Sequence, residues 1–388
     1  MNTNSPTLLT WSEKDTECSA LWRSEQNLPA RVVLADDTLT ADAAYRLACE
    51  GSGLLWRGDF QNARQLLQAM ARRIDKPQKA KRKKSDAAAP AGGAAFHAHR
   101  QAQAQRTRVL SQVLIALDGD YSIGLRRAPD AKQACVQAFG PASGQASVIS
   151  LRALQGVIGA FEWRKNGVEL PALGEDLRIH PHYGVFSPVR GEYVSLVAKA
   201  PLPEALKTHA VAFDIGVGTG VLSAVLARRG AKTVVATDMA ERALVCARDN
   251  LQRLGLQNQV QLLQADLFPP GQAALVVCNP PWLPARPTSV LEQAVYDEGS
   301  QMLKGFLAGL KAHLCEGGEG WLILSDLAEH LGLRTREALL GWITDAGLQV
   351  LGRMDVKPAH NKTRDESDPL HAARAAEVTS LWRLGAAG

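Results

Sequence analysis

The stretch best suited to chemistry is a tetrapeptide that follows the apolar run 274–277: Asn279, Pro280, Pro281 and Trp282. The Asn279 side-chain oxygen and the Pro280 carbonyl can each accept a hydrogen bond from a planar NH2 group. Two such acceptors would orient the nitrogen lone pair and stabilise positive charge that develops on the nitrogen. The prolines restrict the backbone, and Trp282 offers a flat face on which a base or an amide can stack. The alternative is a proline-rich turn without a chemical role.

A glycine-rich stretch follows an earlier apolar run, and its notable members are Asp214, Gly216, Gly218 and Gly220. Glycines at such a position allow a sharp turn from strand to helix and the close approach of a nucleotide ligand. The spacing is GxGxG, whereas the dinucleotide pattern GxGxxG would require glycine at Val221. A tight turn without a ligand is the structural alternative.

Two further acidic residues follow the next two expected strands. Asp238 lies about 20 residues after Gly216, where an ionised carboxylate can accept both hydroxyls of a ribose. Its alternative role is to cap the next helix, and NAD-binding sheets use a similar acid. Asp266 follows the run 260–263 and can accept from an adenine amino group, with Leu267 packed nearby.

The elements that must position these residues alternate regularly between strand and helix. The expected strands are 211–215, 233–237, 260–263, 273–278, 320–324, 348–354 and 378–384. The expected helices are 221–229, 240–254, 292–313 and 335–347. This pattern predicts an α/β fold with a Rossmann-like, doubly wound, mostly parallel seven-stranded sheet and a C-terminal antiparallel hairpin. Because parallel strands end at one edge, the motifs are expected to meet there.

The first part of the chain predicts a smaller α/β N-terminal domain. Strands are expected at 31–35 and 53–56, and helices at 40–49, 62–74 and 101–117. Residues 76–100 contain the basic run 79–84 and predict a flexible linker. The expected organisation is therefore 1–75 as an α/β region, 76–100 as linker, 101–178 as the rest of a substrate-recognition region, and 179–388 as the domain that carries the motifs.

Composition narrows the class of protein. Hydrophobic residues make up 46% and charged residues 21%, as in soluble globular proteins, and no apolar run approaches the length of a membrane span. The first ten residues lack the pattern of a secretory signal. The six cysteines are scattered without a CxxC pair, so we expect a cytoplasmic protein without disulfides or a metal site. The net charge of +5 is compatible with a nucleic-acid partner.

Taken in order, the four motifs resemble class I S-adenosylmethionine-dependent methyltransferases that carry the (Asn/Asp/Ser)-Pro-Pro-(Tyr/Phe/Trp) tetrapeptide and methylate amino groups. The resemblance covers residues 179–384 and implies an acceptor amine at residues 279–282. The segment 182–188 resembles the stretch that lies over the cofactor in this group. For the cofactor S-adenosylmethionine, the implied binding residues are Asp214, Gly216, Gly218, Gly220, Asp238, Asp266, Leu267 and Asn279.

Two branches of this group compete for the substrate: the small-domain rRNA guanine-N2 methyltransferases and the release-factor glutamine-N5 methyltransferases. Residues 296–301 resemble an acidic stretch of the glutamine branch, whereas Trp282 departs from the tyrosine usual there. The large N-terminal region and the basic run 79–84 favour RNA or a ribosomal particle. We therefore expect methylation of an exposed base amine in RNA, either guanine-N2 or adenine-N6. The alternative is a glutamine of a release factor or ribosomal protein.

The same tetrapeptide argues against two other classes of function. In an NAD-dependent dehydrogenase, residues 279–282 would have no role. A non-catalytic RNA-binding module would likewise leave a complete acceptor motif unexplained.

Overall fold

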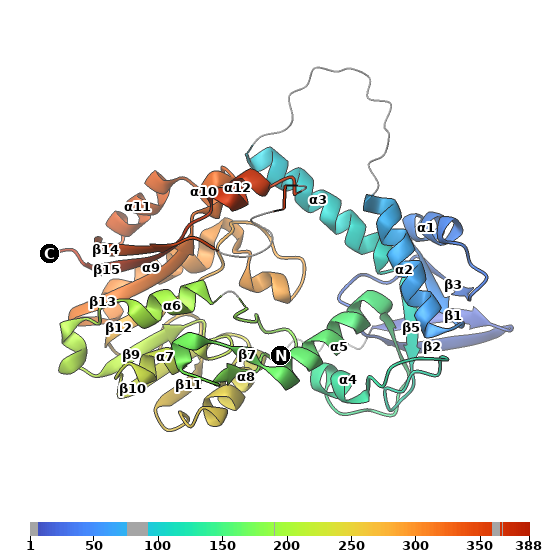
Figure 1. Cartoon of the computed structure of the whole chain (residues 1–388), viewed down its shortest axis with the longest axis horizontal. Helices are drawn as coiled ribbons and strands as arrows, with labels where there is room; N and C mark the ends of the chain where they lie inside the picture. Colours follow the sequence, from blue (N-terminus) through green and yellow to red (C-terminus); the bar gives the residue numbers. More distant parts are fainter. Residues whose placement is uncertain (1–6, 76–91, 190, 359–364, 367) are drawn as a thin grey trace, which may run out of the picture. The chain divides into compact units, whose positions relative to one another are not determined.

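A computed structural model describes residues 7–75, 92–189, 191–358, 365–366 and 368–388. The chain folds as two compact units (Figure 1), the first comprising Met1–Ala89 and His97–Glu162 and the second Pro90–Phe96 and Trp163–Gly388. The second unit begins before the expected residue 179, because the apolar side chains of Val168, Leu170 and Leu173 join its core. Within the described ranges, every helix is too short or too polar to cross a lipid bilayer.

A seven-stranded sheet forms the centre of the second unit, in the order β11-β10-β9-β12-β13-β15-β14. Its strands are β9 (Val211–Ile215), β10 (Thr233–Asp238), β11 (Val260–Gln264), β12 (Ala273–Cys278), β13 (Leu314–Ser325), β14 (Leu348–Val356) and β15 (Thr379–Ala386). Strands β9 to β13 are parallel, and β15 runs antiparallel to both β13 and β14. The predicted α/β class with a parallel sheet is confirmed.

Helices cover both faces of this sheet. One face carries α6 (Glu192–Lys199), α7 (Val221–Arg228) and α8 (Glu241–Arg253), and the other carries α9 (Gln301–His313) and α11 (Arg336–Asp345). Side chains alternate along β9, so Ala212 packs with the first group while Phe213 and Ile215 pack with the second. Shorter elements are β7 (Val168–Glu169), β8 (Arg178–Ile179), α10 (Leu327–His330), α12 (His371–Ala376) and the 3-10 helices Pro171–Leu173, Glu204–Lys207, Leu291–Ala294 and Glu298–Ser300.

The helix expected at 292–313 begins later than predicted, because the backbone breaks before it. Gly299 and Ser300 have φ angles of +67° and +56°, in the left-handed region that interrupts a right-handed helix. The Asp297 carboxylate then accepts hydrogen bonds from the backbone N–H groups of Met302 and Leu303 at 3.1 and 3.2 Å. Asp297 thus satisfies free donors in the first turn of α9.

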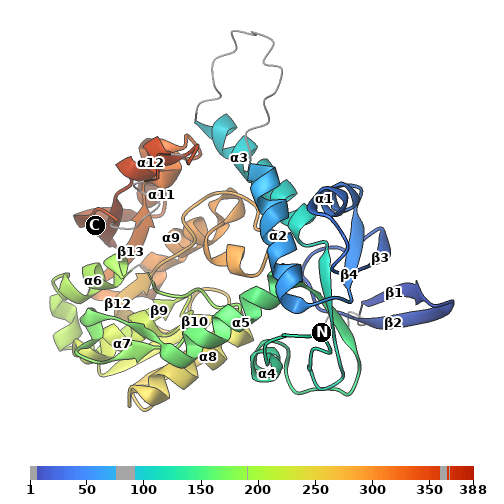
Figure 2. The ribbon, with the colours of Figure 1, turned by 45° about the vertical axis from the view of Figure 1, so that its right-hand side comes forward.

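The first unit contains a six-stranded mixed sheet in the order β1-β2-β6-β5-β4-β3. Its strands are β1 (Leu8–Glu13), β2 (Thr16–Trp22), β3 (Arg31–Ala35), β4 (Ser52–Trp56), β5 (Val113–Leu117) and β6 (Ser147–Ser150). Its helices, two of which also extend into the second unit, are α1 (Ala41–Cys49), α2 (Phe60–Asp75), α3 (Gly93–Leu110), α4 (Lys132–Phe139) and α5 (Leu151–Asn166). Figure 2 shows α1 and α2 packed together beside β3 and β4.

Two expectations for the first part of the chain need correction. The helix expected at 101–117 ends at Leu110, and Val113–Leu117 form strand β5, because a short apolar run fits a buried strand as well as a helix. Helix α3 begins at Gly93, inside the stretch 76–100 that we expected to be a linker. The basic run 79–84 lies outside the described residues.

Candidate active site

The strand order of the second sheet reverses between β9 and β12. From β9 the chain continues outward through β10 and β11, and it then returns to β12 on the other side of β9. In open α/β sheets, ligands bind at the carboxyl ends of the strands beside such a reversal. Ile215 at the end of β9 pairs with both Thr237 and Cys278, so the residues that follow these positions meet at one edge. The structure therefore brings the glycine stretch, Asp238 and Asn279 together.

The glycine stretch forms a turn that other residues could adopt only with strain. Gly216, Gly218 and Gly220 have φ angles of +80°, +52° and +81°. A Cβ atom added at Gly220 would lie 3.3 Å from the Ala247 Cα and Cβ atoms in α8, whereas one added at Gly218 would meet no atom within 4 Å. Gly220 thus allows close helix packing, and Gly218 leaves open space beside the turn.

Asp214 is a buried carboxylate directly before this turn, with 1% of its surface exposed. The Ser223 hydroxyl in α7 donates to Oδ2 at 2.6 Å, while Oδ1 has no hydrogen-bond partner among the described residues. Burial raises the pKa of Asp214 to about 6, and the nearby charge of Asp238 adds to this rise. Unpaired buried acceptors are unusual and favour a ligand contact.

Asp238 lies at the end of β10, where its carboxylate contacts both the glycine turn and the residue that precedes α8. Its Oδ2 accepts from the Gly218 N–H at 3.2 Å, and its Oδ1 accepts from the Ala240 N–H at 2.9 Å, just before α8. Each carboxylate oxygen has a further lone pair for a ligand hydroxyl. The role at the start of the helix and the predicted ribose contact are therefore chemically compatible.

Asp266 and Leu267 lie in the turn after β11. The Asp266 side chain is exposed. Leu267 has a φ angle of +64°, which is uncommon for a residue other than glycine, and its carbonyl accepts from the Thr237 hydroxyl at the end of β10. This turn is thus fixed against the strand that carries Asp238, and the adenine contact stays a prediction.

The tetrapeptide contains a contact that the sequence reasoning missed. The Trp282 indole N–H donates to the Asn279 Oδ1 atom at 2.9 Å. Asn279 and Trp282 are both half-buried, and Pro280 is buried. This hydrogen bond fixes which end of the Asn279 amide is the acceptor and leaves the oxygen with a second lone pair. The sequence signal for this contact was the tryptophan at position 282, because phenylalanine and tyrosine have no indole N–H to donate.

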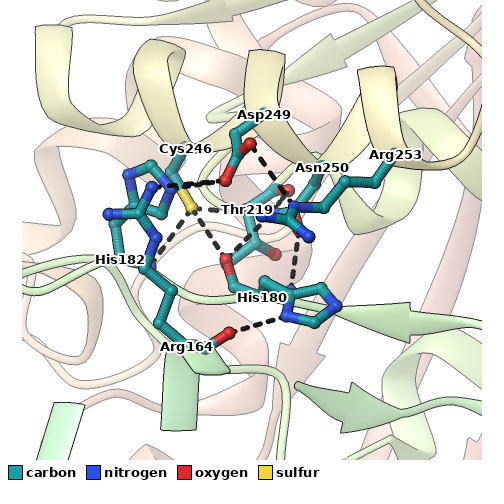
Figure 3. A network of polar contacts seen from close by, with 8 residues as sticks. All are labelled: Arg164, His180, His182, Thr219, Cys246, Asp249, Asn250 and Arg253. Carbon is teal, nitrogen blue, oxygen red and sulfur yellow. Dashed lines mark hydrogen bonds and ion pairs between the residues drawn. The ribbon is translucent and has the colours of Figure 1, made fainter. Parts of the chain in front are cut away.

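The segment expected to lie over the cofactor begins beside α8. The His182 Nε2 atom lies 3.0 Å from an Asp249 carboxylate oxygen (Figure 3). Burial lowers the pKa of the His182 imidazole below its ordinary value, so this ring is neutral at neutral pH. Within the described residues, no group of three or more His, Cys, Asp or Glu side chains could hold a metal ion.

Fold and site together define the class of protein. A doubly wound sheet with a glycine turn, an acid at the end of the next strand and an Asn-Pro-Pro-Trp tetrapeptide at the strand reversal is the arrangement expected of a class I methyltransferase domain. Residues 176–333 match the family model described as methyltransferase small domain.

The chain is similar to methyltransferases whose names give several different substrates. The ribosomal protein L11 methyltransferase of Caldanaerobacter subterraneus subsp. tengcongensis is 30% identical over 31% of this chain and 44% of that protein. The release factor glutamine methyltransferase of Gloeobacter violaceus is 32% identical over 48% of this chain and 62% of that protein. The tRNA1(Val) (adenine(37)-N6)-methyltransferase of a Shewanella species is 27% identical over 46% and 75%. The chain spans about half the length of the L11 and release-factor relatives.

Proposed function

We propose that the second unit is an S-adenosylmethionine-dependent N-methyltransferase that transfers a methyl group to a planar amino group. The observation that carries this proposal is the place of Asn279 and its neighbours at the carboxyl end of β12, beside the glycine turn. A cofactor loop and an acceptor site for an NH2 group at the same strand reversal suit transfer between two bound molecules. A dehydrogenase would not use the tetrapeptide.

The residues around the glycine turn fit the proposed cofactor. Gly218 leaves open space, Asp238 keeps free acceptor positions, and the buried Asp214 Oδ1 has no partner among the described residues. Asp238 would hold the ribose, and Asp266 with Leu267 would contact the adenine. When bound, S-adenosylmethionine supplies a methyl group on a positively charged sulfur.

The tetrapeptide would hold the acceptor. The Asn279 Oδ1 atom and the Pro280 carbonyl accept the two N–H bonds of the amine, which points the nitrogen lone pair away from both. As the nitrogen becomes positively charged, the same oxygens stabilise that charge, and they need no rearrangement because the prolines restrict the backbone. Trp282 supplies the flat face beside the acceptor and, through its N–H, holds the Asn279 oxygen in place.

An exocyclic base amine in RNA is the acceptor that we place first. The first unit has its own six-stranded sheet, and recognition of a large substrate would give this unit a role. A small-molecule substrate would not require such a separate unit. The relative that acts on tRNA adenine-N6 supports an RNA base as acceptor.

A protein glutamine is the second candidate, and one observation favours it. The stretch 296–301, which resembles the glutamine branch, lies directly beside the tetrapeptide. Leu283 forms a β-bridge with Tyr296, and the Asp297 N–H donates to the Leu283 carbonyl at 2.9 Å. Release-factor relatives support this candidate as well.

The test is transfer of tritium from labelled S-adenosylmethionine into total RNA and total protein of a strain that lacks the gene. Label in RNA supports the first candidate, and label in protein alone supports the second. The Asn279→Ala protein serves as the matched control and is expected to transfer no label. Calorimetry with S-adenosylhomocysteine and NAD provides the cofactor test, and binding of NAD alone would refute the proposal.

A further inference from the structure

A single buried amide on α8 contacts two different parts of the candidate cofactor site. Asn250 has 0% of its surface exposed. Its Nδ2 group donates to the Thr219 carbonyl at 3.1 Å and to the His180 carbonyl at 3.2 Å, and its Oδ1 accepts from the His180 N–H at 2.7 Å. Figure 3 shows the amide between the helix and the segment that contains His180. All donors and one acceptor position of the amide are therefore in use.

The two contacted segments have distinct places in the site. Thr219 lies between Gly218 and Gly220, in the last part of the glycine turn before α7. His180 lies two residues before the segment 182–188, which the sequence predicts to lie over the cofactor. We name residues 180–188 the strap. Asn250 thus joins the turn and the strap through one side chain.

Neighbouring side chains of α8 hold the same strap by similar means. One helical turn before Asn250, the Cys246 sulfur accepts from the His182 N–H at 3.4 Å and donates to the His180 carbonyl at 3.7 Å. Asp249 contacts the His182 ring at 3.0 Å. The Cys246 sulfur also accepts from the Asn250 Nδ2 group at 3.5 Å. Asp249 contacts the strap without contacting the glycine turn, whereas the Asn250 amide contacts both.

We propose that Asn250 is a positioning residue that couples the conformation of the strap to that of the glycine turn. This inference rests on the proposed function, because the coupling matters through a cofactor held between these two parts. A ligand that orders one segment then orders the other, since both share the same buried amide. Loss of the amide removes its donor from two buried carbonyls at once, and these can be satisfied only by movement of the turn and the strap.

The test compares Asn250→Asp with the wild-type full-length protein. The aspartate keeps an acceptor for the His180 N–H but directs a second oxygen toward the Thr219 and His180 carbonyls, which repel it. Gln252→Ala, at an exposed position of the same helix, is the matched control. We expect Asn250→Asp to weaken binding of S-adenosylhomocysteine at least about tenfold, with kcat at saturating cofactor changed less than about threefold.

Hydrogen exchange distinguishes this coupling from a merely structural role. In the wild-type protein, S-adenosylhomocysteine is expected to slow amide exchange in residues 180–182 and in the glycine turn together. In Asn250→Asp, exchange in both segments is expected to be faster, and the ligand no longer slows them in parallel. Asp249→Ala, which removes a contact to the His182 ring and none to the glycine turn, is expected to speed exchange in residues 180–182 only, and it serves as the second variant if Asn250→Asp does not fold.

Unchanged cofactor affinity in a folded Asn250→Asp protein would overturn the inference. Faster exchange in the glycine turn of Asp249→Ala, equal to that in the strap, would overturn it as well. If the wild-type protein does not bind S-adenosylhomocysteine, the proposed function fails instead. The coupling is then judged from exchange without ligand, where it requires Asn250→Asp to loosen both segments.

Discussion

Replacing Asp214 with asparagine removes a buried negative charge and keeps the shape of the side chain. Burial raises the pKa of this carboxyl group from its ordinary value of 3.8 to about 6. A difference of this size corresponds to about 3 kcal/mol of unfavourable free energy for the ionised form. The asparagine oxygen can still accept from the Ser223 hydroxyl, which lies 2.6 Å from the carboxylate in the wild-type protein.

The pH dependence follows from the direction of this shift. Because the folded state has the higher pKa, it binds more protons than the unfolded state between pH 3.8 and about 6. The contribution of Asp214 to the free energy of unfolding is therefore greatest at acidic pH and falls as the pH rises through this window. The full penalty persists at neutral pH.

The asparagine variant escapes this penalty but buries an NH2 group without a partner, which costs about 1 kcal/mol or more. We expect Asp214→Asn to raise the free energy of unfolding at neutral pH by about 1–2 kcal/mol and to lose this gain near pH 4. Urea unfolding at both pH values measures the difference. Asp176→Asn, at an exposed loop position of the same unit, is the control and is expected to have little effect.

Cofactor affinity supplies the second half of this test. If Asp214 contacts the cofactor through its unpaired Oδ1, the stabilised variant binds S-adenosylhomocysteine at least about tenfold more weakly in calorimetry. Lower stability than wild type at neutral pH would refute the electrostatic reasoning. Unchanged affinity would limit Asp214 to its contact with α7.

Three further substitutions test the other roles. Asn279→Ala is expected to abolish methyl transfer and to change cofactor affinity by only a few-fold, so retained turnover would exclude the proposed acceptor contact. Asp238→Ala is expected to weaken cofactor binding by at least ~1.4 kcal/mol in calorimetry, and equal binding would limit this residue to the start of α8. Trp282→Phe keeps a flat face but loses the N–H that holds Asn279, so kcat is expected to fall about tenfold with the acceptor KM nearly constant. A higher KM at unchanged kcat would instead assign Trp282 to stacking alone.

The sequence predicted the central sheet of the second unit well, for two physical reasons. Apolar runs such as 273–278 are bounded by turn residues and have the length of buried strands, so they are recognisable locally. Alternation with helices then requires parallel strands, whose carboxyl ends share one edge. The meeting of Gly216, Asp238 and Asn279 followed from these two rules.

Other features depend on contacts that local patterns do not record. The Asn250 amide reaches His180, 70 residues earlier in the chain, and nothing in the helical pattern of α8 marks this position as polar and buried. The strand Val113–Leu117 was expected to continue a helix because its side chains are apolar on both faces. The late start of α9 depends on the left-handed backbone at Ser300, a residue without a strong preference for that conformation.

The strand reversal between β9 and β12 also has a consequence for biosynthesis. As the chain leaves the ribosome, β9, β10 and β11 emerge before β12, which begins at Ala273. One edge of β9, Val211–Ile215, therefore has unpaired backbone groups while its other edge can already pair with β10. Such an apolar edge can pair with other chains until its own partner arrives. The pairing of β9 with β12 is thus the last junction among β9, β10, β11 and β12 to form, and slow translation between β11 and β12 would prolong the aggregation-prone stage.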